Sequence, residues 1–187
     1  MLNSQSGFSL LETLLAMAIG SVLLLACARF LPALQLGVMQ HSRMQIAGDE
    51  VWQQVWTVAK HLQRAGYCNG QCTGQPLTID NSGACVIVQW DSNSNGRWEP
   101  SGHSESEQMG FRLQNGALET LRGATRCSGR GWEKTTDPGQ ITVQRFNVSL
   151  QRTTGFAPQL TVSMVARVVG LHGQEIAAAL SVTGYNL

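Results

Sequence analysis

The N-terminus of the chain carries a long apolar segment that contains a glutamate. Between Phe8 and Leu31 the polar side chains are few, namely Ser9, Glu12, Thr13, Ser21 and Arg29. About 20 residues at 1.5 Å per residue cross the core of a bilayer, so this segment predicts one membrane-spanning helix. A lone carboxylate at hydrocarbon depth costs roughly 2.5 to 3.5 kcal/mol. Glu12 therefore needs a compensating partner, which makes it a candidate functional residue.

A cleavable secretory signal is the alternative interpretation of this segment. The apolar run is longer than a typical signal peptide requires, and the small-residue cleavage sites fall inside it. The preceding MLNSQS contains no Lys or Arg, which weakens both a signal peptide and an orientation set by positive charge. We favour an uncleaved anchor. Because no other stretch is comparably apolar, the remaining residues are expected on one side of the membrane.

Charge and motifs argue against several functions. The net charge is +1 and only 13% of residues are charged, so nucleic acid is not an expected partner. A loose basic run near Trp132 could contact DNA, but we favour a solvated loop because Glu133 lies within the run; its members are Arg122, Arg126, Arg130 and Lys134. The chain has no catalytic motif, and its four histidines are isolated in sequence. We expect no enzymatic activity, no catalytic residues, and surface or capping roles for His41, His61, His103 and His172.

The cysteines favour an oxidising compartment. Cys27 lies in the apolar segment, where a small buried apolar role is expected. Four more follow it, namely Cys68, Cys72, Cys85 and Cys127. They predict two disulfides, with a four-thiolate zinc site as the alternative that their irregular spacing disfavours. Three pairings are open at this stage.

Helical periodicity continues beyond the apolar segment. Val51, Val55, Val58 and Leu62 recur at spacings of four, three and four, and Trp52, Trp56 and Ala59 are expected to widen this buried stripe. Basic residues followed by Gly66 are typical of a helix C-terminus. One long helix is therefore predicted from near Phe8 to near Ala65, with Pro32, Gly37 and Gly48 as positions where it could break.

Short strands follow this helix. CVIVQW is a compact apolar run, and Asn115-Gly116 separates two strand-like pieces, which is a strong hairpin signal. Apolar residues alternate between Leu160 and Val168, and Glu175–Tyr185 is expected to return as a strand. The predicted fold is α+β, with the helix lying on an antiparallel sheet.

The segment DSNSNG resembles the start of a calcium loop. Asp91, Asn93 and Asn95 offer oxygens at alternate positions, and Gly96 is sixth. The twelfth position is Gly102 rather than a glutamate, so Glu99, Glu105 or Glu107 could serve only in a different loop geometry. Asx-rich segments also form turns through their own backbone. We favour a structural turn, with no cofactor and with calcium as the alternative.

The segment GFSLLETL, Gly7 to Leu14, resembles the type IV prepilin signature. The resemblance implies that prepilin peptidase cleaves between Gly7 and Phe8 and that the new Phe8 amine is methylated. Glu12 becomes the fifth residue of the processed chain. In that family the carboxylate is thought to meet the N-terminal amine of a neighbouring subunit, and a paired charge is tolerable where a lone one is not.

Three further segments extend the resemblance over most of the chain. HLQRAGYCNGQC, CVIVQWDSNSNGRW and SVTGYNL resemble the prepilin peptidase-dependent protein B group, J-type minor pilins related to the pseudopilin J of type II secretion. The resemblance implies a type IV pilin-like fold. It also implies a low-abundance subunit that joins three other minor pilins at the pilus tip and primes assembly.

These inferences together predict the organisation of the chain. Residues 1–7 form the leader, 8–36 the transmembrane assembly helix, and 37–187 a periplasmic head. The protein is expected to cross the bacterial inner membrane once and to reach the pilus tip on assembly. Expected partners are other minor pilins, the major pilin, the peptidase and the inner-membrane assembly platform. A secretion pseudopilin and a tip adhesin or DNA receptor remain open as alternatives.

Overall fold

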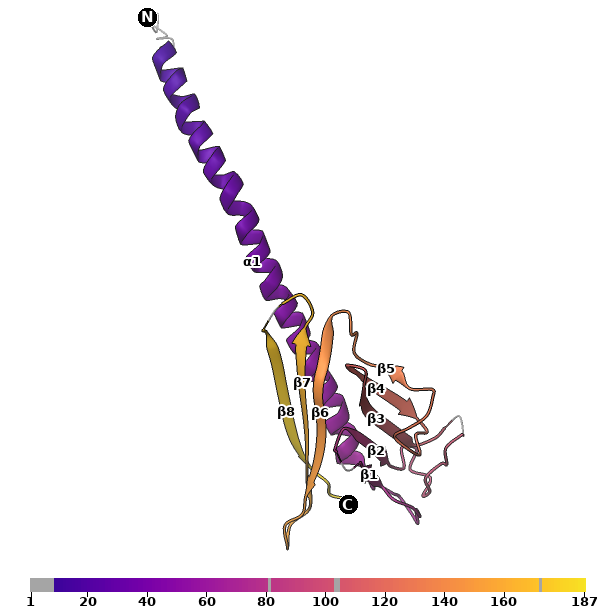
Figure 1. The fold of residues 1–187 in the computed structure, drawn as a ribbon. Helices are drawn as coiled ribbons and strands as arrows, with labels where there is room; N and C mark the ends of the chain where they lie inside the picture. The colour runs from indigo at the N-terminus through magenta and orange to yellow at the C-terminus, as the bar shows by residue number, and fades with distance from the viewer. Residues whose placement is uncertain (1–8, 81, 103–104, 172) are drawn as a thin grey trace, which may run out of the picture. The chain divides into compact units, whose positions relative to one another are not determined.

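The computed structural model describes residues 9–80, 82–102, 105–171 and 173–187 (Figure 1). The chain separates into two compact units that divide between Arg43 and Met44. Helix α1 crosses this boundary, and all the described strands belong to the second unit, the head. The α+β class predicted from the sequence is confirmed.

Helix α1 spans Leu10–Arg64 without interruption. This confirms the single long helix predicted, and the helix does not break at Pro32, Gly37 or Gly48, the positions where a break was possible. A proline removes one N–H donor and disturbs one turn, and the hydrogen bonds on either side can carry the helix past it. Glycine lowers helix propensity by only about 1 kcal/mol per residue.

The first unit contains the apolar part of α1. Its side chains are exposed almost throughout, including Leu10, Leu24 and Phe30. An 18-residue window has a mean hydropathy of 2.2, and none of it is buried within the chain. By length and composition, this part of the helix can cross a membrane.

The part of α1 that belongs to the head buries one face. The valines and the leucine of the predicted stripe are buried, as are Ala47 and Ala59. Trp52 and Trp56 were expected to widen the stripe, but they are 44% and 55% exposed. Successive residues of an α-helix are 100° apart, so each tryptophan is rotated by that angle from the buried valine before it. The buried face is therefore narrower than predicted.

Five strands form the first antiparallel sheet, in the order β1-β2-β3-β4-β5 (Figure 1). Their bounds are β1 Leu77–Ile79, β2 Cys85–Gln89, β3 Gln108–Gln114, β4 Ala117–Arg122 and β5 Glu133–Lys134. The hairpin predicted at Asn115-Gly116 joins β3 to β4. Both turn residues have positive φ, 50° and 74°, as a two-residue type I′ turn requires.

Three longer strands form a second antiparallel sheet, in the order β6-β7-β8. They are β6 Ile141–Gln151, β7 Gln159–Val168 and β8 Glu175–Thr183. The alternation predicted for β7 is confirmed, because every second side chain from Leu160 to Val168 is buried. The last segment is a strand, as expected. A single sheet was predicted from the sequence, whereas the described residues form two.

One hydrophobic core joins α1 to both sheets. It includes Leu62 of α1, Val86 and Phe111 of the first sheet, and Phe146 and Val162 of the second. Backbone hydrogen bonds also link the sheets, since Val143 N–H donates to the Gly116 carbonyl and Val148 N–H to the Gly83 carbonyl, both at 2.8 Å. The head is thus stabilised by contacts between segments far apart in the sequence.

Candidate functional site

Polar groups in the apolar part of α1 fall into two kinds. The hydroxyl groups bond within the helix, since Thr13 Oγ1 donates to the Leu10 carbonyl at 2.9 Å and Ser21 Oγ to the Ala18 carbonyl at 2.8 Å. Such local bonds satisfy a hydroxyl group in an apolar environment. Glu12 differs, because its charged side chain is exposed in the first turn of the helix. It is therefore available to a group from another molecule.

Gly7 and Phe8 lie outside the described residues, so the cleavage and methylation sites stay predictions. The role of Glu12 also stays a prediction, although its position is clear. A negative charge in the first turn is favourable, because the helix dipole places partial positive charge there.

The structure pairs the four head cysteines as Cys68–Cys72 and Cys85–Cys127. This resolves the three open pairings and removes the four-thiolate zinc alternative, because each sulfur is bonded to another. Cys27 is a free thiol and is exposed on α1, rather than buried as expected. The sequence had no signal for the pairing, since it depends on which loops the fold brings together.

The Cys85–Cys127 disulfide ties the segment after β4 to the outer face of the first sheet. Beneath that segment, Arg112 and Glu119 form a salt bridge at 2.9 Å, and Arg112 also donates to the Cys127 carbonyl at 2.8 Å. The centroid of the Trp132 ring lies 4.4 Å from the guanidinium carbon of Arg112. Paired charges and a stacked ring offset the cost of burying this arginine. No local sequence pattern indicated this cluster, because its members come from separate strands and a loop.

The basic run for which DNA contact was the alternative to a solvated loop does not stack its cations on Trp132. Its four members, Arg122, Arg126, Arg130 and Lys134, are all exposed. Trp132 stacks instead on Arg112, which belongs to β3. An aromatic platform interleaved with free cations, as single-stranded nucleic acids need, is therefore not formed by this run.

The DSNSNG loop is organised around Asp91, which is 1% exposed. Its carboxylate accepts backbone N–H groups of Asn69, Asn95 and Gly96 at 2.9 to 3.0 Å. Burial would raise the pKa of Asp91, but these backbone donors outweigh it and hold the pKa below its ordinary value. The Asp91 side chain therefore orders the loop in its charged form.

The other loop oxygens also accept local hydrogen bonds. Asn93 Oδ1 accepts from Asn95 N–H and Asn95 Oδ1 from Arg97 N–H, which are Asx turns. Glu107 Oε1 accepts from Asn93 N–H at 3.2 Å, and Asn95 Nδ2 donates to Glu99 at 2.6 Å. The hydrogen bond from Asn95 holds the pKa of Glu99 below its ordinary value. Glu99 and Glu107 both reach this loop; Glu105 is exposed.

His61 is a packed histidine rather than the surface or capping residue expected. Its ring lies 4.9 Å from the Trp90 ring and 5.2 Å from that of Phe111, between centroids. Burial, with a smaller contribution from Arg64, lowers its pKa to about 4. The ring is therefore neutral at neutral pH. His41 is exposed, and His103 and His172 lie outside the described residues.

Comparison with known proteins identifies the family. The family described as prepilin peptidase-dependent protein B matches residues 39–183. The prokaryotic N-terminal methylation motif matches residues 2–28. A curated relative, prepilin peptidase-dependent protein B of Escherichia coli (strain K12), is 55% identical over 183 residues, which are 98% of each chain. The chain belongs to the prepilin peptidase-dependent protein B family. No solved structure matches it significantly.

Membership of the prepilin peptidase-dependent protein B family confirms the resemblance drawn from the sequence. The methylation motif covers the apolar segment of α1 up to Ala28, and the family match covers nearly all of the head. A long N-terminal apolar helix followed by antiparallel sheets is the α+β, pilin-like arrangement predicted.

Proposed function

We propose that this protein is a minor pilin that joins other minor pilins in a complex at the pilus tip and primes pilus assembly. The observation that carries the proposal is a helix whose first part exposes apolar side chains and one carboxylate, and whose second part is built into a folded head. Such a helix can be stored in a membrane and then packed beside similar helices.

Before assembly, the apolar part of α1 anchors the protein in the inner membrane and the head lies in the periplasm. Two disulfides in the head fit this topology, because disulfides persist in oxidising compartments such as the bacterial periplasm. The peptidase removes residues 1–7 on the side of the membrane opposite the head and leaves Phe8 as a methylated N-terminal residue.

During assembly, the Glu12 carboxylate meets the N-terminal amine of a neighbouring subunit. The pair offsets the cost of a charge in an apolar environment and sets the axial register of the two helices. The head then selects neighbours among the minor pilins, the major pilin and the assembly platform. This mechanism requires no enzymatic chemistry from the chain.

Mass spectrometry of the mature N-terminus tests the proposal. In cells with the peptidase we expect a chain that begins at methylated Phe8, and in cells without it a chain that begins at Met1. Gly7→Val should retain the leader even when the peptidase is present, with Ser4→Ala as a matched control that is still processed. A chain cleaved beyond Ala28, with no assembly helix, would contradict the proposal.

Deletion of the gene separates the pilus from the secretion alternative. We expect loss of surface pili with normal export of type II secretion substrates, because priming of the pilus is the function proposed. The opposite pattern, normal pili and failed secretion, would assign the chain to the pseudopilins instead.

A further inference from the structure

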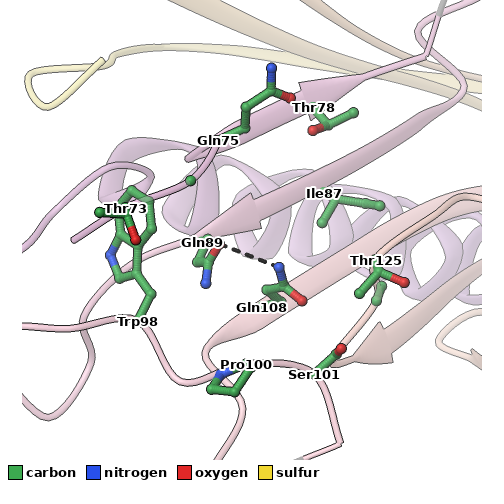
Figure 2. Close-up of a pocket in the computed structure, with 12 residues that line it drawn as sticks. Thr73, Gln75, Thr78, Ile87, Gln89, Trp98, Pro100, Ser101, Gln108 and Thr125 are labelled. Atoms are coloured by element: carbon green, nitrogen blue, oxygen red, sulfur yellow. Dashed lines mark hydrogen bonds between the residues drawn. The ribbon is translucent and has the colours of Figure 1, made fainter.

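A cavity of about 410 Å³ opens on the first sheet of the head (Figure 2). Val86 and Val88 of β2 point into the core, so the alternate residues Ile87 and Gln89 point to the opposite face and form the cavity floor with Gln108 of β3. Loop residues complete the walls, among them Trp98. The volume lies within the range of small-molecule sites, about 300 to 1,000 Å³.

The described side chains that line the cavity are uncharged. The cavity has 12 described lining residues, and none of them is Asp, Glu, Lys, Arg or His. Phosphate and carboxylate ligands are bound by arginine, lysine or clustered N–H groups, and divalent cations by carboxylates. Amides and hydroxyls predominate instead, and these groups both donate and accept hydrogen bonds. Such a lining fits a neutral ligand rich in hydroxyl groups.

Two glutamine amides form the polar centre of the floor. Gln108 Nε2 donates to Gln89 Oε1 at 3.3 Å, between residues paired across β2 and β3. Gln89 is 7% exposed, and among the described residues its amide nitrogen has no acceptor; Figure 2 shows it turned away from Gln108. Gln108 Oε1 is buried and also lacks a partner among those residues. Buried polar groups are normally satisfied, so Gln108 Oε1 points to a ligand or ordered water. The Gln89 amide nitrogen supplies a donor to the same cavity.

Trp98 supplies an aromatic wall with a fixed orientation. Its Nε1 donates to the Tyr67 carbonyl at 3.0 Å, which holds the ring beside the cavity. Gly74 lies beside the six-membered part of the ring, since a Cβ added there would be 3.8 Å from it, an ordinary van der Waals contact. An aromatic face is electron-rich and attracts the C–H groups of an apolar surface. The face of a pyranose ring presents such C–H groups, and its edge presents hydroxyls.

Both disulfides hold the walls of the cavity in place. Cys72 immediately precedes the lining segment Thr73–Gln75, and Cys127 follows Ala124–Thr125 by two residues. The floor is hydrogen-bonded through its backbone, since Gln89 N–H donates to the Pro76 carbonyl at 2.9 Å. A preformed site loses less entropy on binding than a flexible one. The cavity thus exists before a ligand arrives.

We propose that this cavity binds a neutral sugar, with Trp98 stacked on the face of a pyranose ring and Gln89 and Gln108 bonded to its hydroxyls. The proposal goes beyond pilus assembly and does not depend on it. In an assembled pilus, the same site would offer the head a contact with surface glycans.

Sugar binding is tested with the full-length chain in a phosphocholine detergent, because glycoside detergents would fill the site. The probes are the methyl glycosides of glucose, galactose, mannose and N-acetylglucosamine, measured by saturation-transfer NMR. We expect saturable binding of at least one probe with a Kd of about 1 mM, a typical weak affinity. Trp98→Ala and Gln89→Leu should each weaken binding at least about tenfold, a change of about 1.4 kcal/mol.

Matched variants separate the site from general effects. Trp56→Ala removes an exposed tryptophan outside the cavity and should leave binding unchanged. Trp98→Phe retains a ring and should bind more tightly than Trp98→Ala, which keeps the test informative if the alanine variant unfolds. Glucuronate and glucose 6-phosphate should bind less well than glucose, because none of the described residues that line the cavity is a cation.

Three outcomes would overturn the proposal. The first is that no probe shows saturable binding up to about 20 mM, which is about 20 times the expected Kd. The second is binding that the Trp98 and Gln89 variants leave unchanged. The third is a preference for the charged sugars. Because the assay needs no pilus, its failure would leave the assembly function intact. Failure of the N-terminal processing test would likewise leave the sugar site standing.

Discussion

The two parts of α1 differ in how their apolar side chains are used. Leu10–Arg43 exposes leucines, valines and a phenylalanine to the surroundings, whereas the part in the head buries one narrow face in a core shared with two sheets. The helical backbone is the same in both. The difference shows that the first part must obtain its apolar contacts from lipid or other chains, while the second obtains them within its own chain.

The contrast extends to the acidic residues. In the head, buried carboxylates have partners within the chain, such as Arg112 for Glu119 and backbone N–H groups for Asp91. In the first part, Glu12 is exposed on an apolar surface.

Loss of the Glu12 carboxylate should have the largest effect. Glu12→Ala should abolish surface pili while membrane insertion stays normal, because a neutral residue makes insertion easier but cannot pair with an amine. Electron microscopy would count pili, and membrane fractionation would measure insertion. Asp49→Asn, an exposed acid in the head part of α1, is the matched control. Normal pilus numbers in the Glu12→Ala variant would show that Glu12 does not need a partner from another chain, and would remove its contrast with the paired carboxylates of the head.

The two disulfides should stabilise the head unequally. The sequence separations are 42 and 4 residues, so chain entropy predicts losses of about 4 kcal/mol without Cys85–Cys127 and about 2 kcal/mol without Cys68–Cys72. Double Cys→Ala variants and denaturant unfolding would measure this. Cys27→Ala is the control and should leave unfolding unchanged. Equal losses would mean that residual structure, rather than loop length, determines the effect.

The buried and exposed leucines of α1 should respond differently to truncation. Leu62→Ala removes a fully buried side chain and should lower the free energy of unfolding by roughly 3 kcal/mol. Leu36→Ala, in the exposed part, should change it by less than about 0.5 kcal/mol. Denaturant unfolding monitored by near-UV circular dichroism would report both. A comparable loss at Leu36 would show that the first part of α1 contributes to the folded head.

His61 should make the head less stable in mild acid. Its pKa falls from 6.5 to about 4 on folding, so the unfolded chain binds the proton more readily. Stability from this group is present above pH 6.5 and is lost as the pH falls towards 4. Allowing for partial solvent exposure, we expect a loss of about 1 kcal/mol between pH 7 and pH 5. His61→Phe should remove this difference; an unchanged pH slope would contradict the assignment.

Calcium should have the smallest effect. The Asx oxygens of Asp91, Asn93 and Asn95 already accept hydrogen bonds from the loop, so we expect the loop to hold its fold after treatment with a chelator. About 1 mM calcium should then stabilise the head by less than about 0.4 kcal/mol, the limit for a Kd at or above that concentration. A larger stabilisation, detected as a rise in Tm, would show that Glu99 and Glu107 bind a cation. Magnesium at the same concentration is the control.

Local patterns predicted the elements well, and contacts between distant segments decided the rest. The helix, the turn at Asn115-Gly116 and the alternation in β7 follow from periodicity and backbone preference, which neighbouring residues determine. The exposure of Trp52 was wrongly predicted, because periodicity gives the direction of an apolar face but not its width. The cavity under Trp98 was also missed, since its lining comes from loops and strands separated in sequence.

By itself, the sequence determined that the chain has a membrane-length apolar helix with an acid near its start, followed by an α+β head. These features are local, so the order of side chains specifies them. Tertiary structure decided that there are two sheets, which cysteines pair, and that His61 is packed between aromatic rings. Those outcomes depend on which distant surfaces bury each other. The hydrophobic effect is non-directional, so an apolar sequence pattern does not specify which surfaces will pack together.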